Sequence, residues 1–357
     1  MSLLPTISDL VARARSDLRV GLPVVLQRDG LGLVVLACET AVDPRLSGLR
    51  ALGPVVAAIT GRRAETLKIR VYDGGIARIV MPDAAGARWL SELADPARDM
   101  GAPMRGPFRE DRSGDASLHR LALDLAKSAQ LLPAVAGVSV ETWPEGLTVL
   151  PADLAAGDLA GHAPLTAVAA AHLPMALAGA GRLHIFRPDN AEIEHYVVEV
   201  GRPDRSNPVL TRLHSACFTG DVLGSLKCDC GPQLHTALAE IGAAGEGVLL
   251  YLNQEGRGIG LANKIRAYAL QDQGFDTVEA NHRLGFEDDE RDFRIGADLL
   301  RRMGFGAVRL MTNNPRKVDM MGSEGIDVIE RVPLVTKSNR HNAHYLEVKR
   351  DKSGHLL

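Results

Sequence analysis

The sequence predicts an α/β (α+β) protein with two domains. Short apolar runs typical of buried strands alternate along the chain with segments whose apolar residues recur at helical spacing, which is the pattern of layered α/β architectures. The chain has 357 residues, about twice the usual size of one domain. Apolar residues make up 46% and charged residues 24%, a globular composition that argues against disorder. We therefore expect two cores, in domains spanning residues 1–180 and 181–357.

Helices and strands are predicted in turn along the first half. A helix over 7–18 precedes the apolar run LPVVLQRDGLGLVVLACE, which reads as buried strand. Further elements are expected in this order: a strand at 55–59, a surface loop at 95–115, a helix at 119–132, a strand at 135–140, a helix at 165–171 and a strand at 181–186.

The second half continues the alternation. Strands are predicted at 194–201, 207–215, 245–253 and 307–313, and helices at 233–241, 260–273 and 295–303. In the helix at 260–273 we expect an apolar face of Leu261, Ile265, Tyr268 and Ala269, with Lys264 off that face. Asn313, Asn314 and Pro315 predict a sharp turn, and the polar tail 337–357 is expected to be partly mobile.

Charge and composition exclude several classes of protein. The formal net charge is −3 and aromatic residues make up 4%, so neither a basic field nor a set of stacking platforms for nucleic acid is expected. The first 20 residues lack the uninterrupted apolar core of a secretory signal, and no run of about 18 apolar residues predicts a membrane span. Only four cysteines occur, which favours a reduced, cytoplasmic setting.

Three cysteines predict a metal site. Cys217 is followed by Cys228 and, one residue later, by Cys230, and thiolates in a Cys-x-Cys unit can reach one Zn²⁺ ion. Three thiolates leave one position open for water, although His214 or His235 could close the shell. The alternative is a set of buried free thiols. Cys38 lies in an apolar strand and is expected to be a core residue.

A glycine-rich turn at residues 254–260, QEGRGIG, lies between a predicted strand and a predicted helix. Backbone N–H groups and the positive end of a helix would favour a phosphate here, and Arg257 adds guanidinium donors. Glu255 would repel phosphate but suits a donor-rich ligand edge such as guanine N1–H and N2–H₂. The alternative is an ordinary turn with solvated charges.

Two further polar segments indicate a functional site only when they are considered together with these motifs. Residues 287–292, EDDERD, read alone as a solvated acidic loop. The turn after the predicted strand at 307–313 contains Thr312, Arg316 and Lys317, whose donors suit phosphate oxygens, although a plain surface turn has the same composition.

Taken together, four segments closely resemble GTP cyclohydrolase II. They are RLHSACFTGDVLGSLKCDCGPQL, NQEGRGIGLANKIRAYALQDQGFDTVEANHRLGF, DDERDF and RLMTNNPRKV, and the resemblance extends over about residues 181–357. It implies zinc-dependent opening of the GTP imidazole ring, with release of formate and pyrophosphate, to give 2,5-diamino-6-(5-phosphoribosylamino)pyrimidin-4-one, the first step of riboflavin biosynthesis. It also implies one Zn²⁺ per subunit, Mg²⁺ with the triphosphate, and a homodimer.

The resemblance also assigns roles to residues. The zinc ligands fall on Cys217, Cys228 and Cys230; the proposed general base falls on Asp289, the proposed nucleophile on Arg291, and a tyrosine of the ring-opening site on Tyr268. Contacts to guanine and phosphates fall on Arg212, Leu213, His214, Ser215, Ala216, Gln233, Glu255, Gly256, Arg257, Thr277, Thr312 and Lys317.

Arginine is an awkward nucleophile. Removing a proton from a guanidinium, whose ordinary pKa lies above 12, costs roughly 7 kcal/mol at neutral pH. Arg291 could instead stabilise charge on the α-phosphate. Two residues depart from the family pattern: Ala216 stands where glutamate is frequent, and Asn253 where arginine is common. These departures could alter triphosphate affinity or a contact between subunits.

The first half resembles, more weakly, a dihydroxybutanone phosphate synthase domain. That family needs an acidic ENEGD-type segment, but residues 29–33 read DGLGL. Its GHTE-type segment is also replaced, by residues 114–117, with His119 only nearby. Without those metal ligands we expect a catalytically silent relative that serves stability, dimerisation or regulation.

Two other functions are compatible with the motifs. A paralogue could open the ring and retain the formyl group, or act on a related nucleotide. A protein of another class, a zinc-stabilised module that binds nucleotide or RNA, would show salt-dependent RNA binding without GTP turnover.

Overall fold

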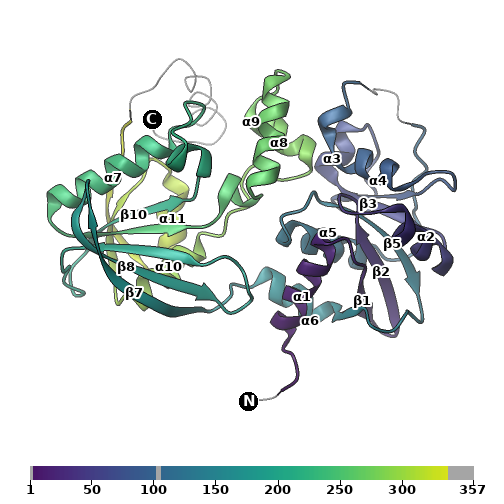
Figure 1. Ribbon diagram of the computed structural model, residues 1–357, viewed down its shortest axis with the longest axis horizontal. Coiled ribbons are helices and arrows are strands. Elements are labelled where there is room, and N and C mark those ends of the chain that lie inside the picture. The colour runs from purple at the N-terminus through teal and green to yellow at the C-terminus, as the bar shows by residue number, and fades with distance from the viewer. Residues whose placement is uncertain (1–2, 102–105, 337–357) are drawn as a thin grey trace. The chain divides into compact units, whose positions relative to one another are not determined.

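The computed structural model describes residues 3–101 and 106–336, which form two compact units (Figure 1). Of these residues, unit 1 contains 3–101, 106–161 and 262–290, and unit 2 contains 162–261 and 291–336. The packing boundary thus lies at Gly161, and part of the second half packs with the first. Each unit has its own sheet, which confirms the α/β class and the two cores. The tail 337–357 lies outside the described residues.

Unit 1 is built on a six-stranded sheet. Its strand order is β4 (Ile76–Val80), β3 (Val56–Thr60), β5 (Ala134–Val140), β2 (Leu31–Ala37), β1 (Val24–Arg28) and β6 (Thr148–Pro151). The predicted strand run at 22–39 is a hairpin, in which Val24 pairs with Val35. Asp29 and Gly30 turn the chain with φ of 50° and 80°, the positive values that a tight two-residue hairpin turn requires.

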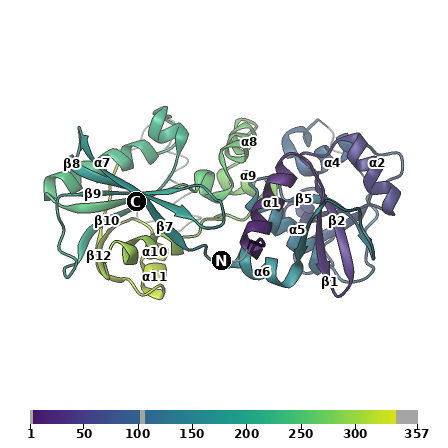
Figure 2. The same ribbon diagram turned by 60° about the horizontal axis from the view of Figure 1, so that its bottom comes forward.

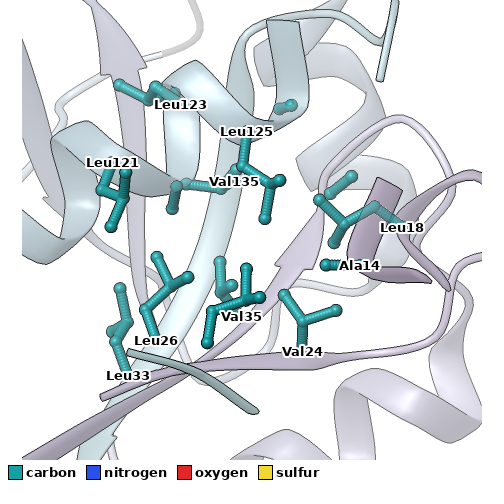
Figure 3. Close-up of a cluster of buried hydrophobic side chains, with 14 of the residues drawn as sticks. Ala14, Leu18, Val24, Leu26, Leu33, Val35, Leu121, Leu123, Leu125 and Val135 are labelled. Atoms are coloured by element: carbon teal, nitrogen blue, oxygen red, sulfur yellow. The ribbon is translucent and has the colours of Figure 1, made fainter. Parts of the chain in front are cut away.

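Helices α1 (Ile7–Arg19), α5 (Ser117–Ser128) and α6 (Ala152–Ala160) share one hydrophobic core with the sheet. Figure 3 shows Leu18 of α1 and Leu125 of α5 packed with Leu26 and Val35 of the hairpin. Thr6 and Asp9 form a capping box that starts α1 where the sequence predicted a helix. Four more elements complete the first half: α2 (Asp43–Leu52), α3 (Gly61–Thr66), α4 (Ala87–Ala94) and the short helix Pro96–Arg98.

Helices α8 (Leu261–Asp272) and α9 (Thr277–Leu284) pack in unit 1, with α9 against α3. The predicted apolar face of α8 is wrong: Leu261 and Ile265 are 38% and 48% exposed, whereas Lys264 is buried. The reason is that polar residues of α8 have partners elsewhere in unit 1. Asn263 Nδ2 donates to the Gln130 carbonyl at 3.0 Å, so the helix turns its polar side inward.

Unit 2 is built on a seven-stranded mixed sheet. Its order is β13 (Asp327–Val332), β12 (Ala307–Met311), β10 (Val209–Ser215), β11 (Gly247–Leu252), β9 (His195–Val200), β8 (Gly179–Pro188) and β7 (Leu165–Met175). The first four strands run parallel to one another, and the remaining pairings are antiparallel.

The helix predicted at 165–171 is wrong, because these residues begin β7. The alanine-rich segment favours helix locally, but β7 pairs with β8 along its whole length, from Leu165 opposite Pro188 to Met175 opposite Gly179. Long-range strand pairing therefore overrides local propensity here.

Helices cover both faces of this sheet (Figure 2). Helix α7 (Cys230–Ala244) packs on one face, through Ala237 and Ile241, and α10 (Arg294–Arg302) and α11 (Pro315–Ser323) pack on the other. The helix predicted at 233–241 lies within α7, and the helix predicted at 295–303 corresponds to α10, which ends one residue earlier. Within the described residues, no helix is both long and apolar enough to cross a membrane.

Candidate functional site

Three adjacent parallel strands of unit 2, β12, β10 and β11, end at the same edge of the sheet. Ser215, the last residue of β10, pairs with Leu252, the last residue of β11. The motif segments follow these strand ends directly, beginning at Ala216, Asn253 and Thr312. Open α/β sheets bind ligands beyond the carboxyl ends of their strands, so the fold brings these motifs together at a suitable place.

The three predicted metal-binding cysteines form a cluster at this edge. Cys217 follows β10, Cys228 lies in the next loop, and Cys230 begins α7. Their sulfur atoms all lie within 4.8 Å of one another, and Cys217 Sγ lies 3.7 Å from Cys228 Sγ. A tetrahedral zinc with Zn–S bonds of 2.3 Å separates its sulfurs by about 3.8 Å. The cluster therefore has the spacing of a zinc site.

Gly220 leaves the room that this cluster needs. It lies in the π-helical turn Phe218–Val222, and a Cβ at this position would come 2.9 Å from Cys228 Sγ and 3.0 Å from Cys217 Sγ. Hydrogen bonding to Cys217 and Cys228, together with burial, raises the pKa of the Cys230 thiol well above its ordinary value. A cation among the sulfurs would reverse that effect by stabilising thiolates, so the donor set fits a soft divalent metal.

A buried carboxylate, Asp221, holds the loop of Cys217. Its Oδ2 accepts hydrogen bonds from the Cys217 backbone N–H at 3.0 Å and from the Tyr251 hydroxyl at 2.9 Å. His214 Nε2 lies 3.0 Å from the same oxygen. Burial lowers the pKa of His214, although Asp221 opposes this effect. The sequence did not single out Asp221 or Tyr251.

Neither histidine considered as a fourth ligand belongs to the metal group. Within residues 3–101 and 106–336, that group consists of the three cysteines alone. The Nε2 atom of His214 faces Asp221, and His235 lies on α7 outside the group. Three cysteines would therefore occupy three of the four positions of a tetrahedral zinc ion and leave the fourth for another ligand.

Glu255 connects the glycine-rich turn to the cysteine loop. Its Oε2 accepts from the Phe218 N–H at 2.6 Å, and its Oε1 accepts from the Gly256 N–H at 2.9 Å. Gly256 and Arg257 have φ of 64° and 63°, and this left-handed conformation costs about 1–2 kcal/mol at the arginine. Such strain concentrates at functional sites.

The expected phosphate cradle in this turn is only partly present. The N–H groups of Gly258 and Gly260 donate to the carbonyls of Gln254 and Glu255 and are therefore already used. The turn does lie between β11 and α8, as predicted.

Arg212 is a buried cation on β10. Its Nη1 donates to the Met311 carbonyl at 2.8 Å and its Nη2 to Gln233 Oε1 at 2.6 Å. Within the described residues, its buried Nε has no hydrogen-bond partner. Burial lowers the pKa of Arg212 to about 10, with nearby Asp229 opposing the shift, so the guanidinium stays charged at neutral pH. An unpartnered buried donor on a cation is suited to an anionic oxygen.

Two more cations lie at this edge around the ring of Phe293. Arg291 Cζ is 4.7 Å and Lys317 Nζ is 4.8 Å from its ring centroid. Arg291 Nη1 also donates to Ser215 Oγ at 3.3 Å, and Lys317 Nζ donates to the Leu213 carbonyl at 3.3 Å. Phe293 was missed as a site residue, because an isolated aromatic residue in sequence carries no sign of such contacts.

Comparison with known proteins shows the family of the chain. A family model described as GTP cyclohydrolase II matches residues 166–333. A GTP cyclohydrolase-2 of Azospirillum brasilense is 43% identical over 361 residues, covering 97% of this chain and 94% of that protein. The chain belongs to the GTP cyclohydrolase II family. It is therefore an enzyme of the GTP cyclohydrolase II type.

Other relatives match a smaller share of the chain. The GTP cyclohydrolase-2 proteins of Cronobacter sakazakii and Shigella boydii are 58% and 57% identical over 164 residues, which cover 46% of this chain and 83% and 84% of theirs. A solved two-domain 3,4-dihydroxy-2-butanone 4-phosphate synthase from A. baumannii gives 17% identity and a TM-score of 0.28, covering 85% of this chain and 93% of that one. A likeness at this level says nothing about fold or function.

Three residues that the GTP cyclohydrolase II pattern assigns to the site lie in unit 1. Tyr268 is on α8, where its ring centroid is 5.8 Å from Lys264 Nζ. Thr277 begins α9, and its Oγ1 accepts from Gln271 Nε2 at 3.3 Å. Asp289 lies in the loop after α9. The assigned residues are thus divided between the two units.

The two departures from the GTP cyclohydrolase II pattern have contacts within unit 2. The Ala216 N–H donates to the Leu252 carbonyl at 2.7 Å. Asn253 donates from its backbone N–H to His195 Nδ1 at 3.0 Å and from its side chain to the Glu194 carbonyl. Asn253 therefore fixes the end of β11 to the beginning of β9.

Proposed function

We propose that the protein opens the imidazole ring of GTP by hydrolysis and releases formate and pyrophosphate. The product would be 2,5-diamino-6-(5-phosphoribosylamino)pyrimidin-4-one, which places the reaction first in riboflavin biosynthesis. One observation carries the proposal: a cluster of three cysteine sulfurs and three cations, Arg212, Arg291 and Lys317, gather at one edge of the sheet of unit 2.

The cysteine cluster would hold one Zn²⁺ per subunit. When bound, the ion would supply a Lewis acid that activates water for attack on C8 of the purine. Asp221 and Gly220 keep the loop of Cys217 in place and the space between the sulfurs open. In this step the protein would orient the guanine ring so that its C8 atom faces the cysteine cluster.

The three cations would bind the triphosphate, with Mg²⁺ sharing its charge. Arg212 offers its unpartnered Nε, and Lys317 and Arg291 approach from α11 and the loop before α10. Thr312 and Gln233 are proposed as further contacts. Gln233 already donates to Asp229 Oδ2 at 2.5 Å and accepts from Arg212, so one of its functions is to orient that arginine.

Glu255 is proposed to read the guanine edge. Its two oxygens accept backbone N–H groups in this structure, and a carboxylate is an acceptor of the kind that matches the N1–H and N2–H₂ donors of guanine. Asp289 is proposed as general base and Tyr268 as a residue of the ring-opening step.

Arg291 is proposed to act on the α-phosphate, as a nucleophile or as an electrostatic stabiliser. Trapping decides between the two: a phosphoramide on Arg291 would establish covalent catalysis, and its absence from quenched turnover mixtures would leave the electrostatic role.

The test is incubation of the purified protein with GTP, Zn²⁺ and Mg²⁺. Formate, pyrophosphate and the pyrimidine product should appear together in equal amounts. A product that retains the formyl group would identify a paralogue that stops after ring opening. Salt-dependent RNA binding without GTP turnover would instead support the binding module.

We further propose a cytoplasmic homodimer with GTP as its partner and with no nucleic-acid or membrane partner. The first half is proposed to be a silent synthase relative. Residues 29 and 30, where the acidic motif would begin, form the β1–β2 turn, and Leu33 is fully buried. Formation of dihydroxybutanone phosphate from ribulose 5-phosphate by the full chain would contradict this.

A further inference from the structure

The acidic loop, defined as residues 287–290, is held by a lysine from the first half of the chain. Lys127 Nζ on α5 lies 2.7 Å from Glu290 Oε1, and both side chains are only 22% exposed. The same Oε1 atom accepts from the Glu287 N–H at 2.9 Å. The lysine is therefore linked through one carboxylate to the backbone at the start of the loop.

A second set of contacts fixes the entrance to the acidic loop. Thr60 Oγ1 donates to the Gly285 carbonyl at 2.8 Å. Arg62, on α3, donates to Glu287 Oε2 from Nε at 3.0 Å and from Nη2 at 2.8 Å. This pair is more exposed than that of Lys127, at 38% and 54%, so solvent screens it more strongly.

The residues on both sides of Asp289 thus have defined partners. His282 Nε2, on α9, lies 2.7 Å from Asp288 Oδ1, and Lys127 binds Glu290. These two contacts hold the backbone on both sides of Asp289 and therefore limit displacement of the residue as a whole.

The beginning of the segment 262–290, which ends with the acidic loop, also contacts the first half of the chain. Arg266 Nη2, on α8, lies 2.7 Å from Glu39 Oε1, while Glu39 Oε2 accepts from the Leu132 N–H at 2.8 Å. Between these attachments and the acidic loop lie Tyr268 and Thr277.

We propose that the first half of the chain positions the segment 262–290 for catalysis, with Lys127 as the principal positioning residue and Arg62 as a secondary one. The inference rests on the proposed function, because it assigns Asp289 a part in GTP turnover. The proposal assigns a role to the first half of the chain even if that half catalyses no synthase reaction. Helices α3 and α5 of the first half would hold the acidic loop in position. Displacements of about 1 Å can lower a rate about 100-fold, so the effect should fall on kcat.

The experiment compares full-length K127M and R62Q with wild type. K127M should lower kcat about 10- to 100-fold while KM for GTP stays within about twofold and zinc content stays unchanged. R62Q should have a smaller effect, and K127R, which keeps the charge, should recover most of the rate. K68M, at an exposed lysine of unit 1, is the matched control and should behave as wild type.

A double-mutant cycle tests the pair directly. K127M/E290Q should be no slower than the slower single variant, because both changes break one contact. Multiplied losses would contradict the proposal, as would wild-type kcat in K127M or a fall in kcat matched by loss of zinc.

Hydrogen exchange separates this inference from the proposed function, because it needs no turnover. Amides of residues 286–291 should exchange faster in K127M than in wild type, and unchanged exchange would overturn the positioning role. If wild type does not turn over GTP, the proposed function fails whatever the exchange shows.

Discussion

Glu255 Oε2 accepts a hydrogen bond of 2.6 Å from the backbone N–H of Phe218, the residue directly after Cys217. On the other side, the Cys217 N–H donates to Asp221 Oδ2 at 3.0 Å. Two carboxylates from different parts of unit 2 therefore fix the backbone on both sides of one cysteine sulfur. This ties the residue proposed to read guanine to the loop proposed to hold zinc.

Replacing Glu255 should weaken metal binding as well as GTP turnover. Loss of a hydrogen bond to a charged acceptor costs about 1.5–3 kcal/mol, so E255A should bind zinc about 10- to 100-fold more weakly. Competition with a chromogenic chelator measures the affinity. E246A, at an exposed glutamate of the same unit, is the control. Wild-type zinc affinity in E255A would show that the Phe218 contact does not support the cysteine loop.

Adding one methyl group at Gly220 should disrupt the cysteine cluster. A Cβ would lie 3.0 Å or less from two sulfurs and 3.0 Å from Cys230 Cβ, closer than ordinary contacts, so the sulfurs must move apart. We expect G220A to fold but to retain less than about a tenth of the wild-type zinc after dialysis. G322A, in α11 where a Cβ meets no atom within 4 Å, should keep its zinc. Full zinc content in G220A would mean that the loop can shift to accept the methyl group.

The candidate metal-binding and ligand-binding residues could be predicted from the sequence more completely than the residues whose contacts hold them in place. Close cysteine spacing and the placement of motifs after strands follow from local sequence, since ligands must converge and parallel strands share an edge. The supports Asp221, Tyr251 and Phe293 were not foreseen. Some of their partners are distant in the chain: the Tyr251 hydroxyl reaches Asp221, 30 residues away, and the Phe293 ring lies near Lys317.

The wrong predictions have the same origin. The alanine-rich residues 165–171 form a strand because β8 pairs with them. The polar side of α8 is buried because Asn263 and Arg266 have partners 133 and 227 positions away. Local periodicity contains no information about such partners, so helix faces and edge strands are where sequence analysis failed.

Replacing Arg212 by lysine should weaken binding of GTP. Lysine keeps the charge but cannot reach both the Met311 carbonyl and Gln233 while offering a third donor in the position of Nε. We expect R212K to raise KM for GTP about 10- to 100-fold, the equivalent of one hydrogen bond to a charged group. Steady-state kinetics at saturating Mg²⁺ measures this. R309K, on the exposed side of β12, is the control, and an unchanged KM in R212K would remove Arg212 from the phosphate site.

His119 should make unit 1 sensitive to acid. Burial lowers the pKa of this side chain to about 4, and Arg78 adds to the shift, against the opposing charges of Asp111, Asp73 and Asp115. Both ring nitrogens are buried and have no hydrogen-bond partner within the described residues. The folded protein therefore holds the imidazole neutral between pH 6.5 and 4, whereas the unfolded chain takes up a proton. The stability present above pH 6.5 is lost as pH falls toward 4.

The difference should be visible in urea unfolding followed by tryptophan fluorescence, because both tryptophans, Trp89 and Trp143, lie in unit 1. Between pH 7 and 4.5, the wild-type free energy of unfolding should fall by about 2–3 kcal/mol more than that of H119L. H119Q, which is polar but does not titrate, should share the weaker pH dependence of H119L even if its stability at pH 7 differs. Equal declines in wild type and both variants would place the acid sensitivity in other groups, since only the loss of this imidazole separates the three proteins.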